Sequence, residues 1–225
     1  MRQIEVRKNI LTAHEQIAQE NRELFRKKGI FVLNLMSSPG AGKTTLLERT
    51  IELLKGTFSI GVIEGDIATS YDAERIGAHG VKVVQINTGG ACHLDSAMIK
   101  KALAEFSEMK LDALIIENVG NLVCPAEFYL GEDAKAMILS VTEGEDKPLK
   151  YPLMFRISQA LVINKIDLLP YLECRIERIV KDARSLNLDL KLFEISCSTR
   201  AGLSAWKEWL AEEIHKKKVQ SADNE

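Results

Sequence analysis

The segment from Ser37 to Thr45 carries the clearest chemistry in the sequence, reading Ser-Ser-Pro-Gly-Ala-Gly-Lys-Thr-Thr. An apolar run precedes it and a helical pattern follows it, which is the context of a nucleotide phosphate-binding loop. The glycines let backbone N–H groups turn toward phosphates, Lys43 can reach the β and γ oxygens, and the Thr44 hydroxyl can ligate Mg²⁺. The strict pattern begins with glycine, so the match is imperfect by one residue. The predicted phosphate-binding residues are Gly40, Ala41, Gly42, Lys43, Thr44 and Thr45.

A candidate base-reading motif, Asn164-Lys165-Ile166-Asp167, follows the apolar run Ala160–Ile163. The Asp167 carboxylate can accept from the N1–H and exocyclic amine of guanine, whereas adenine presents the opposite pattern. The alternative is an accidental loop with a solvated aspartate. This order of motifs resembles the P-loop GTPases, whose second base-contacting loop is similar to Ser196-Cys197-Ser198. The resemblance implies guanine-nucleotide binding by Asn164, Lys165, Asp167, Ser196 and Cys197.

Carboxylates near the ends of two predicted strands could serve hydrolysis. Glu117-Asn118-Val119-Gly120 stands where the commonest GTPase plan has Asp-x-x-Gly, so Glu117 is expected on the Mg²⁺ side and Gly120 in a switch. Asp66 and Asp72 could approach Mg²⁺ or orient water, although each could also be a helix cap or a solvated loop residue. The expected catalytic residues are Lys43, Asp66, Asp72 and Glu117. The expected Mg²⁺ ligands are Thr44, Asp72 and Glu117.

Two separate segments offer ligands for a softer metal ion. Cys92-His93 follows Gly89-Gly90-Ala91, and Cys124 lies seven residues beyond Glu117. Two thiolates and an imidazole suit Zn²⁺ or Ni²⁺, and three protein ligands leave a position for water or a partner side chain. The alternative makes both cysteines buried thiols and His93 a capping or surface residue.

The motifs together resemble HypB, the family of nickel-insertion GTPases of NiFe-hydrogenase maturation, over about residues 5 to 215. The resemblance implies that Cys92, His93 and Cys124 bind nickel or zinc at a homodimer interface. It also implies a nickel-binding maturation partner, a hydrogenase large subunit as recipient, and an approach of Lys150 to the partner's nucleotide. Two alternatives remain: a regulatory binding module with structural zinc, and the related urease-accessory GTPases, whose metal motif is usually Cys-Pro-His. The matching segments are Ser37–Thr44, Glu64–Asp66, Cys92–Leu94, Glu117–Pro125, Asp146–Pro152 and Asn164–Asp167.

Alternating apolar runs and helical patterns must position these residues. We expect a doubly wound, mainly parallel α/β sheet of the P-loop GTPase type, preceded by an amphipathic helix. The expected strands are Phe31–Met36, Ser59–Ile63, Val81–Ile86, Ala113–Glu117, Ala136–Val141, Ala160–Ile163 and Lys191–Ile195. The expected helices are Ile4–Lys28, Lys43–Leu54, Tyr71–Ala78, Leu94–Ser107, Leu172–Leu186 and Leu203–Lys217. Residues 1–29 form a helical appendage, 30–217 the GTPase domain and 218–225 a polar tail in this interpretation, and 146–152 is a rigid exposed connection.

Composition excludes several classes of protein. The 225 residues carry 30 basic and 32 acidic side chains, so no overall positive field is available to gather nucleic acid. Because no apolar run approaches membrane-span length and no signal core follows the charged N-terminus, we expect a cytoplasmic protein without a membrane partner. The four cysteines form no close-spaced disulfide framework, and Cys174, on a predicted helix, is expected to pack.

Overall fold

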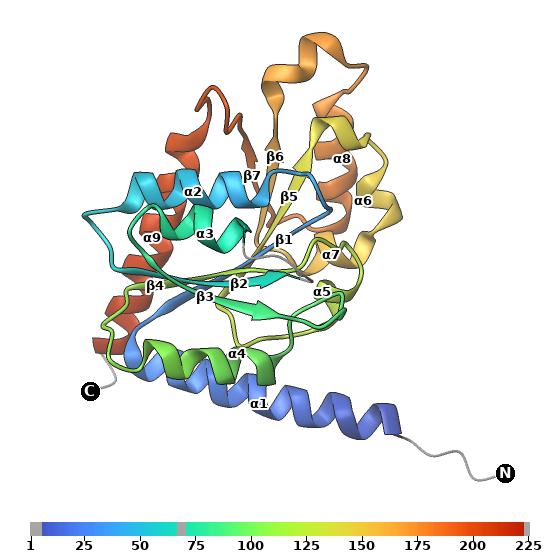
Figure 1. The fold of residues 1–225 in the computed structure, drawn as a ribbon. Helices are drawn as coiled ribbons and strands as arrows, with labels where there is room; N and C mark the ends of the chain where they lie inside the picture. Colours follow the sequence, from blue (N-terminus) through green and yellow to red (C-terminus); the bar gives the residue numbers. More distant parts are fainter. Residues whose placement is uncertain (1–5, 67–70, 223–225) are drawn as a thin grey trace, which may run out of the picture.

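The computed structural model describes residues 6–66 and 71–222, and the side chains of residues 13–66 and 71–221. The described residues form a seven-stranded parallel sheet in the order β3-β2-β4-β1-β5-β6-β7 (Figure 1). The predicted doubly wound, parallel α/β fold is therefore confirmed. The strands are β1 (Phe31–Ser37), β2 (Ile60–Asp66), β3 (Lys82–Asn87), β4 (Ala113–Glu117), β5 (Ala134–Ser140), β6 (Ala160–Asn164) and β7 (Lys191–Glu194).

Helices cover both faces of this sheet because its central strands are apolar on both sides. The longer helices are α1 (Val6–Lys28), α2 (Lys43–Leu54), α3 (Tyr71–Gly77), α4 (Ser96–Leu103), α7 (Pro152–Ile157), α8 (Ile176–Leu186) and α9 (Leu203–Ala222). The shorter ones are α5 (Cys124–Glu127), α6 (Lys147–Lys150) and the 3-10 turns η1 (Ala104–Phe106), η2 (Val141–Glu143) and η3 (Ile166–Tyr171). Side chains of α2, α3 and α9 pack on one face, and those of α1, α4, α5, α7 and α8 on the other.

The amphipathic helix expected before the sheet packs against the domain. α1 lies along α4 (Figure 1), and its Ala18 and Phe25 are buried. The predicted apolar pair Ile10/Leu11 lies outside the described side chains, and Ile4 lies outside the described residues.

Four predicted helical boundaries or loops are wrong for identifiable reasons. The helix expected from Leu94 begins at Ser96, because Asp95 caps it by accepting from the Met98 N–H at 2.8 Å. It ends at Leu103, where η1 replaces its last turn. The helix expected from Leu172 begins only at Ile176. Glu145 accepts from the Arg175 N–H at 2.8 Å and holds this residue extended, so Cys174 lies in a loop.

The C-terminal helix and the proline-containing connection also differ from expectation. α9 continues five residues beyond the expected end at Lys217, so much of the predicted polar tail is helical. Lys217 and Lys218 pair with Asp133 and Asp112, each at 2.6 Å, and tie this helix to the sheet. The connection expected at 146–152 contains α6 and the start of α7, and its Pro148 is buried.

Strand β2 is longer than predicted, and this extension matters for the site. It continues past Ile63 to Asp66 because β3 pairs with it from Gly61 to Asp66, which stands opposite Asn87. Glu64 therefore belongs to a buried strand and stands opposite Glu117 of β4. Within the described ranges, no helix combines the length and apolar character that a bilayer crossing requires.

Candidate nucleotide and metal sites

The phosphate-binding loop joins β1 to α2 at the carboxyl edge of the sheet. Gly40 and Gly42 have φ values of 78° and 97°, which side-chain-bearing residues rarely adopt. A Cβ at Gly42 would lie 2.5 Å from Asn164 Nδ2, so this glycine is needed for space as well. Ser38 donates to the Glu143 carboxylate, which the sequence did not predict. The loop is thus a turn with its backbone closely packed, followed directly by a helix N-terminus.

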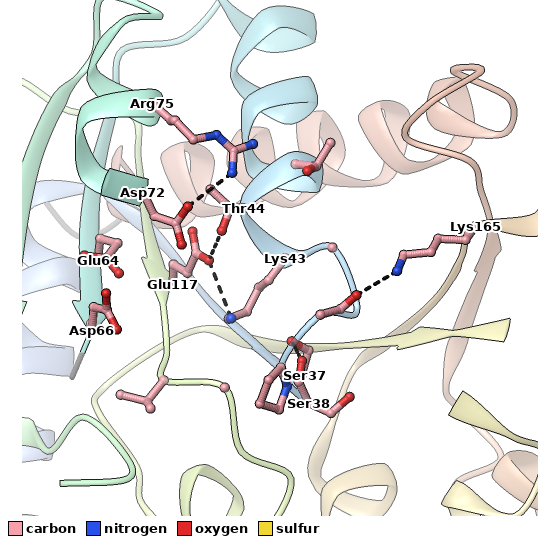
Figure 2. Close-up of a pocket in the computed structure, with 17 residues that line it drawn as sticks. Ser37, Ser38, Lys43, Thr44, Glu64, Asp66, Asp72, Arg75, Glu117 and Lys165 are labelled. Atoms are coloured by element: carbon pink, nitrogen blue, oxygen red, sulfur yellow. Dashed lines mark hydrogen bonds and ion pairs between the residues drawn. The ribbon is translucent and has the colours of Figure 1, made fainter. Parts of the chain in front are cut away.

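The candidate base-reading segment is fastened to this loop. Asn164 Nδ2 donates to the Ala41 carbonyl at 2.9 Å, and Lys165 Nζ donates to the Gly40 carbonyl at 2.7 Å (Figure 2 shows the Lys165 contact). Asn164 Oδ1 also accepts from the Cys197 N–H at 3.2 Å. The phosphate loop and the two segments expected to contact the base are therefore held as one unit.

The other residues of this unit differ in what they expose. Asp167 Oδ1 is buried without a hydrogen-bond partner among the described residues, which is a costly state for a carboxylate oxygen unless a donor is supplied. Ser196 Oγ accepts from the Thr199 N–H at 3.0 Å and shapes the turn. The Cys197 thiol is buried in the core, and burial raises its pKa to about 11, while its N–H donates to Asn164 and its carbonyl accepts from Arg49, so this residue positions the loop.

Beside the phosphate loop lies a cleft of about 570 Å³ that gathers the predicted catalytic side chains. Glu117, at the end of β4, accepts from Thr44 Oγ1 at 2.7 Å and lies 3.5 Å from Lys43 Nζ (Figure 2). Burial raises the pKa of Glu117, against the opposing effects of Lys43 and Thr44. Asp66 and Asp72 line the same cleft, and Asp72 pairs with Arg75 at 3.1 Å.

Glu64 was missed as a site residue, although the sequence motif Glu64-Gly65-Asp66 was noticed. Its side chain lines the cleft with only 3% exposure, and its Oε2 has no hydrogen-bond partner within the described ranges. Burial, together with the negative charges of Glu117, Asp66 and Asp72, raises its pKa to about 8. The sequence alone carries no clear signal for Glu64, because the full length of β2 is visible only once its pairing with β3 and β4 is known.

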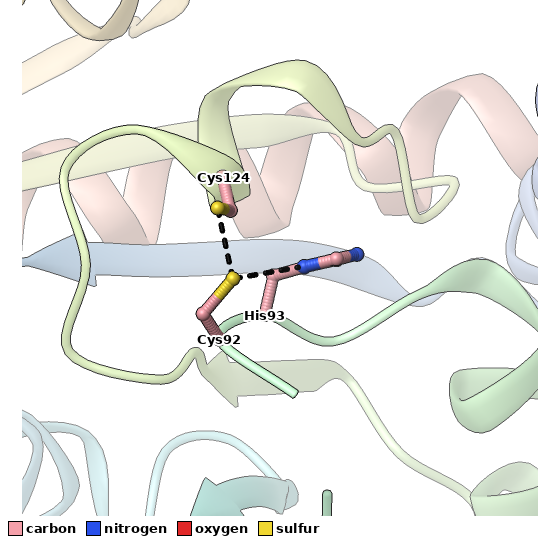
Figure 3. Close-up of side chains that lie close together, drawn as sticks. All are labelled: Cys92, His93 and Cys124. Carbon is pink, nitrogen blue, oxygen red and sulfur yellow. Dashed lines mark hydrogen bonds between the residues drawn. The ribbon is translucent and has the colours of Figure 1, made fainter. Parts of the chain in front are cut away.

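The two metal-ligand segments converge as the sequence suggested. The ligand atoms of Cys92, His93 and Cys124 lie within 4.8 Å of one another (Figure 3). Gly89 and Gly90, with φ values of 60° and 96°, turn the chain so that adjacent Cys92 and His93 face the same point. The cluster comes from the loop after β3 and from the first residue of α5.

The chemistry and spacing of these donors fit a single ion. Cys92 and Cys124 are free thiols, and their sulfurs are 2.8 Å apart. A tetrahedral zinc ion would hold the two sulfurs about 3.8 Å apart, so they would have to move apart by about 1 Å to bind it. His93 Nδ1 lies 3.7 Å from Cys92 Sγ, and its ring stacks on Phe128 at 3.8 Å. Burial lowers the pKa of His93, which favours the neutral ring that ligates metals.

Lys150 lies outside both clusters within this single chain. It is fully exposed on α6 and pairs with Asp146 at 2.6 Å. Its expected approach to a partner's nucleotide therefore stays a prediction.

Comparison with known proteins identifies relatives over nearly the whole chain. The family described as CobW/HypB/UreG, nucleotide-binding domain, matches residues 31–194. The hydrogenase maturation factor HypB of Azotobacter vinelandii is 50% identical over 93% of this chain and 69% of its own length. Among solved structures, HypB from Helicobacter pylori in complex with nickel is 40% identical, with a TM-score of 0.87 over 92% of this chain and 97% of that one. HypB from Archaeoglobus fulgidus is 39% identical, with a TM-score of 0.85 over 91% and 100%. The chain therefore belongs to the CobW/HypB/UreG family and, within it, to the HypB proteins.

Proposed function

We propose that this protein is a GTP-hydrolysing nickel metallochaperone that assists nickel insertion into NiFe-hydrogenase in the cytoplasm. In this proposal GTP binding favours a homodimer and alters the Cys/His metal site. A nickel-binding maturation protein is the partner, and a hydrogenase large subunit is the recipient. The names of the relatives support the process, and the two converging clusters support the chemistry.

In this proposal the residues of the nucleotide cleft have the following roles. Backbone N–H groups of the loop from Gly40 to Thr45 hold the phosphates, and Lys43 neutralises charge that develops on the β and γ oxygens. Asp167 accepts from the guanine ring, and its unpartnered buried oxygen supports this role. Asp66 and Asp72 are the candidates to orient the attacking water.

Magnesium fits the oxygen donors of the cleft. The Thr44 hydroxyl and the carboxylates of Glu117 and Asp72 would hold it, and hard oxygen ligands are those Mg²⁺ prefers. Glu64 and Glu117 each have a buried carboxylate oxygen without a hydrogen-bond partner among the described residues, which favours a cation in the cleft. When bound, the ion supplies charge neutralisation for phosphoryl transfer.

A single observation carries the proposal: one short segment connects the two sites. Glu117 contacts Lys43 and Thr44 in the nucleotide cleft, and seven residues later Cys124 meets Cys92. A change at the γ-phosphate can thereby alter metal ligation, as in other switches ordered by phosphate and Mg²⁺.

The test loads the protein with Ni²⁺ and adds GTP, GDP or a non-hydrolysable GTP analogue, following metal occupancy and oligomer size together. We expect the analogue to change both occupancy and dimerisation, and hydrolysis to reverse the change. A metal that stays bound unchanged through the cycle would overturn the transfer role and favour a regulatory module with a structural ion.

A further inference from the structure

Four polar side chains on or next to strands β4, β1 and β5 are buried, where apolar residues would be expected. Asn34 of β1 is 0% exposed, Asn118 after β4 is 1%, Glu132 before β5 is 3%, and Lys135 of β5 is 8%. Buried polar and charged groups are costly unless they are hydrogen-bonded to one another. We call these four residues the buried polar chain, because each one contacts the next in the order Asn118, Asn34, Glu132 and Lys135.

At one end the buried polar chain begins beside the nucleotide cleft. Asn118 directly follows Glu117, which holds Lys43 and Thr44. The Asn118 Oδ1 accepts from the Leu94 N–H at 3.1 Å and from the Val119 N–H at 2.9 Å. Leu94 is the residue after His93, so one side-chain oxygen joins the switch segment to the first metal-ligand loop.

The other end reaches the second metal-ligand segment. Asn118 Nδ2 donates to Asn34 Oδ1 at 3.2 Å, and Asn34 Nδ2 donates to Glu132 Oε1 at 3.2 Å. Glu132 pairs with Lys135 at 3.4 Å, and Lys135 Nζ donates to the Phe128 carbonyl at 3.0 Å. Phe128 follows α5, which begins at Cys124, and its ring stacks on His93.

The buried polar chain is also fixed to the N-terminal helix. Glu132 Oε2 accepts from the Leu130 N–H at 2.7 Å, and the Leu130 carbonyl accepts from Asn21 Nδ2 at 3.1 Å. Asn21 also donates to the Ser96 carbonyl at the start of α4. These contacts leave Glu132 little freedom to turn away from Asn34.

We infer that the buried polar chain couples nucleotide binding to metal ligation, with Asn34 as its central positioning residue. The inference rests on the proposed function. With phosphate and Mg²⁺ bound in the cleft, Lys43 and Thr44 would exchange their present contacts with Glu117 for contacts with these ligands, and the backbone of Glu117 and Asn118 would readjust. The hydrogen bonds of Asn118 carry this readjustment to Leu94, and those of Asn34 carry it through Glu132 and Lys135 to Phe128.

The experiment measures the Ni²⁺ dissociation constant of the full chain with Mg²⁺ and either GDP or a non-hydrolysable GTP analogue. The wild type should show at least a tenfold ratio between the two states. Asn34→Ala should reduce this ratio to less than twofold, while its Ni²⁺ affinity with GDP and its affinity for GDP each change less than threefold. The control is Asn187→Ala, which removes an asparagine away from both sites whose Nδ2 donates to the Ser158 carbonyl at 2.8 Å.

Each outcome separates the inference from the proposed function. Equal Ni²⁺ affinities in the two wild-type states would overturn the nucleotide-controlled metal site itself. A tenfold ratio that survives in Asn34→Ala would overturn only the coupling role of the buried polar chain, as would an equal loss in Asn187→Ala. If thermal melts show that Asn34→Ala is unfolded, Glu132→Gln replaces it, because it keeps the side-chain shape but removes the charge facing Lys135 and one of the two acceptor oxygens that Asn34 Nδ2 and the Leu130 N–H use. The ratio should then fall to threefold or less, and an unchanged ratio would refute the inference.

Discussion

Replacing Glu64 with glutamine should stabilise the nucleotide-free protein, and increasingly so as the pH rises. Glu64 is buried beside Glu117, and its pKa is raised to about 8 from an ordinary value of 4.5. Below pH 4.5 the folded and unfolded chains both hold the proton, so the carboxyl imposes no penalty. Between pH 4.5 and 8 only the unfolded chain ionises, so wild-type stability falls throughout this window and then levels off.

The size of the effect follows from the same values. Each pH unit between 4.5 and 7 costs the wild type at most about 1.4 kcal/mol, which gives at most about 3 kcal/mol at pH 7. Local relaxation and water entry reduce this penalty, so we expect Glu64→Gln to gain about 1–3 kcal/mol at pH 7 relative to its difference at pH 4.5.

Urea unfolding at pH 4.5, 6 and 7, with a chelator and without nucleotide, measures this difference. The matched control is Glu105→Gln, whose side chain is 65% exposed and lies outside the cleft. If the free energy of unfolding of Glu64→Gln differs from that of the wild type by the same amount at all three pH values, Glu64 ionises normally. That result would refute the conclusion that burial and the neighbouring carboxylates raise its pKa.

Three further substitutions test individual residues. Lys43→Ala should reduce GTP turnover by at least about a hundredfold in a folded protein, because it removes the charge facing the phosphates, and phosphate-release assays with circular dichroism check it. Asp167→Asn should weaken GTP binding by about a hundredfold and shift preference toward xanthosine nucleotides, and an unchanged guanine preference in side-by-side titrations would remove Asp167 from the base site. Cys124→Ala should weaken Ni²⁺ binding by at least about tenfold and leave monomer GTP affinity nearly intact, and wild-type-like nickel titrations would argue against its role as a ligand.

Sequence reasoning reached those parts of the molecule that are encoded locally. The residues of the phosphate loop are consecutive, with a strand before them and a helix after them. The strands are predicted by short apolar runs. Convergence of Cys92-His93 with Cys124 was also foreseeable, since parallel strands place their following loops at one edge of the sheet.

What depends on distant partners was not foreseeable from one chain. Glu64 lies just beyond the expected strand Ser59–Ile63. Its burial could not be predicted, because it depends on the neighbouring strands β3 and β4. Asn34 lies within the expected apolar strand Phe31–Met36, and nothing local shows that it meets Asn118 and Glu132, which are 84 and 98 residues away. The late start of α8 likewise depends on Glu145, 30 residues before Arg175.

The connection between the two sites has two physically different parts. The segment from Glu117 to Cys124 also touches the phosphate loop midway, where a Cβ on Gly120 would lie 3.2 Å from the Pro39 nitrogen. This segment by itself could move Cys124, but it makes no covalent link to His93 on its separate loop. The buried polar chain reaches both loops. Asn118 binds Leu94, the residue after His93, and Lys135 binds Phe128, whose ring stacks on His93. The affinity of a metal site built from two loops depends on where one loop lies relative to the other, so contacts that reach both loops offer a control over the site that the covalent segment alone does not.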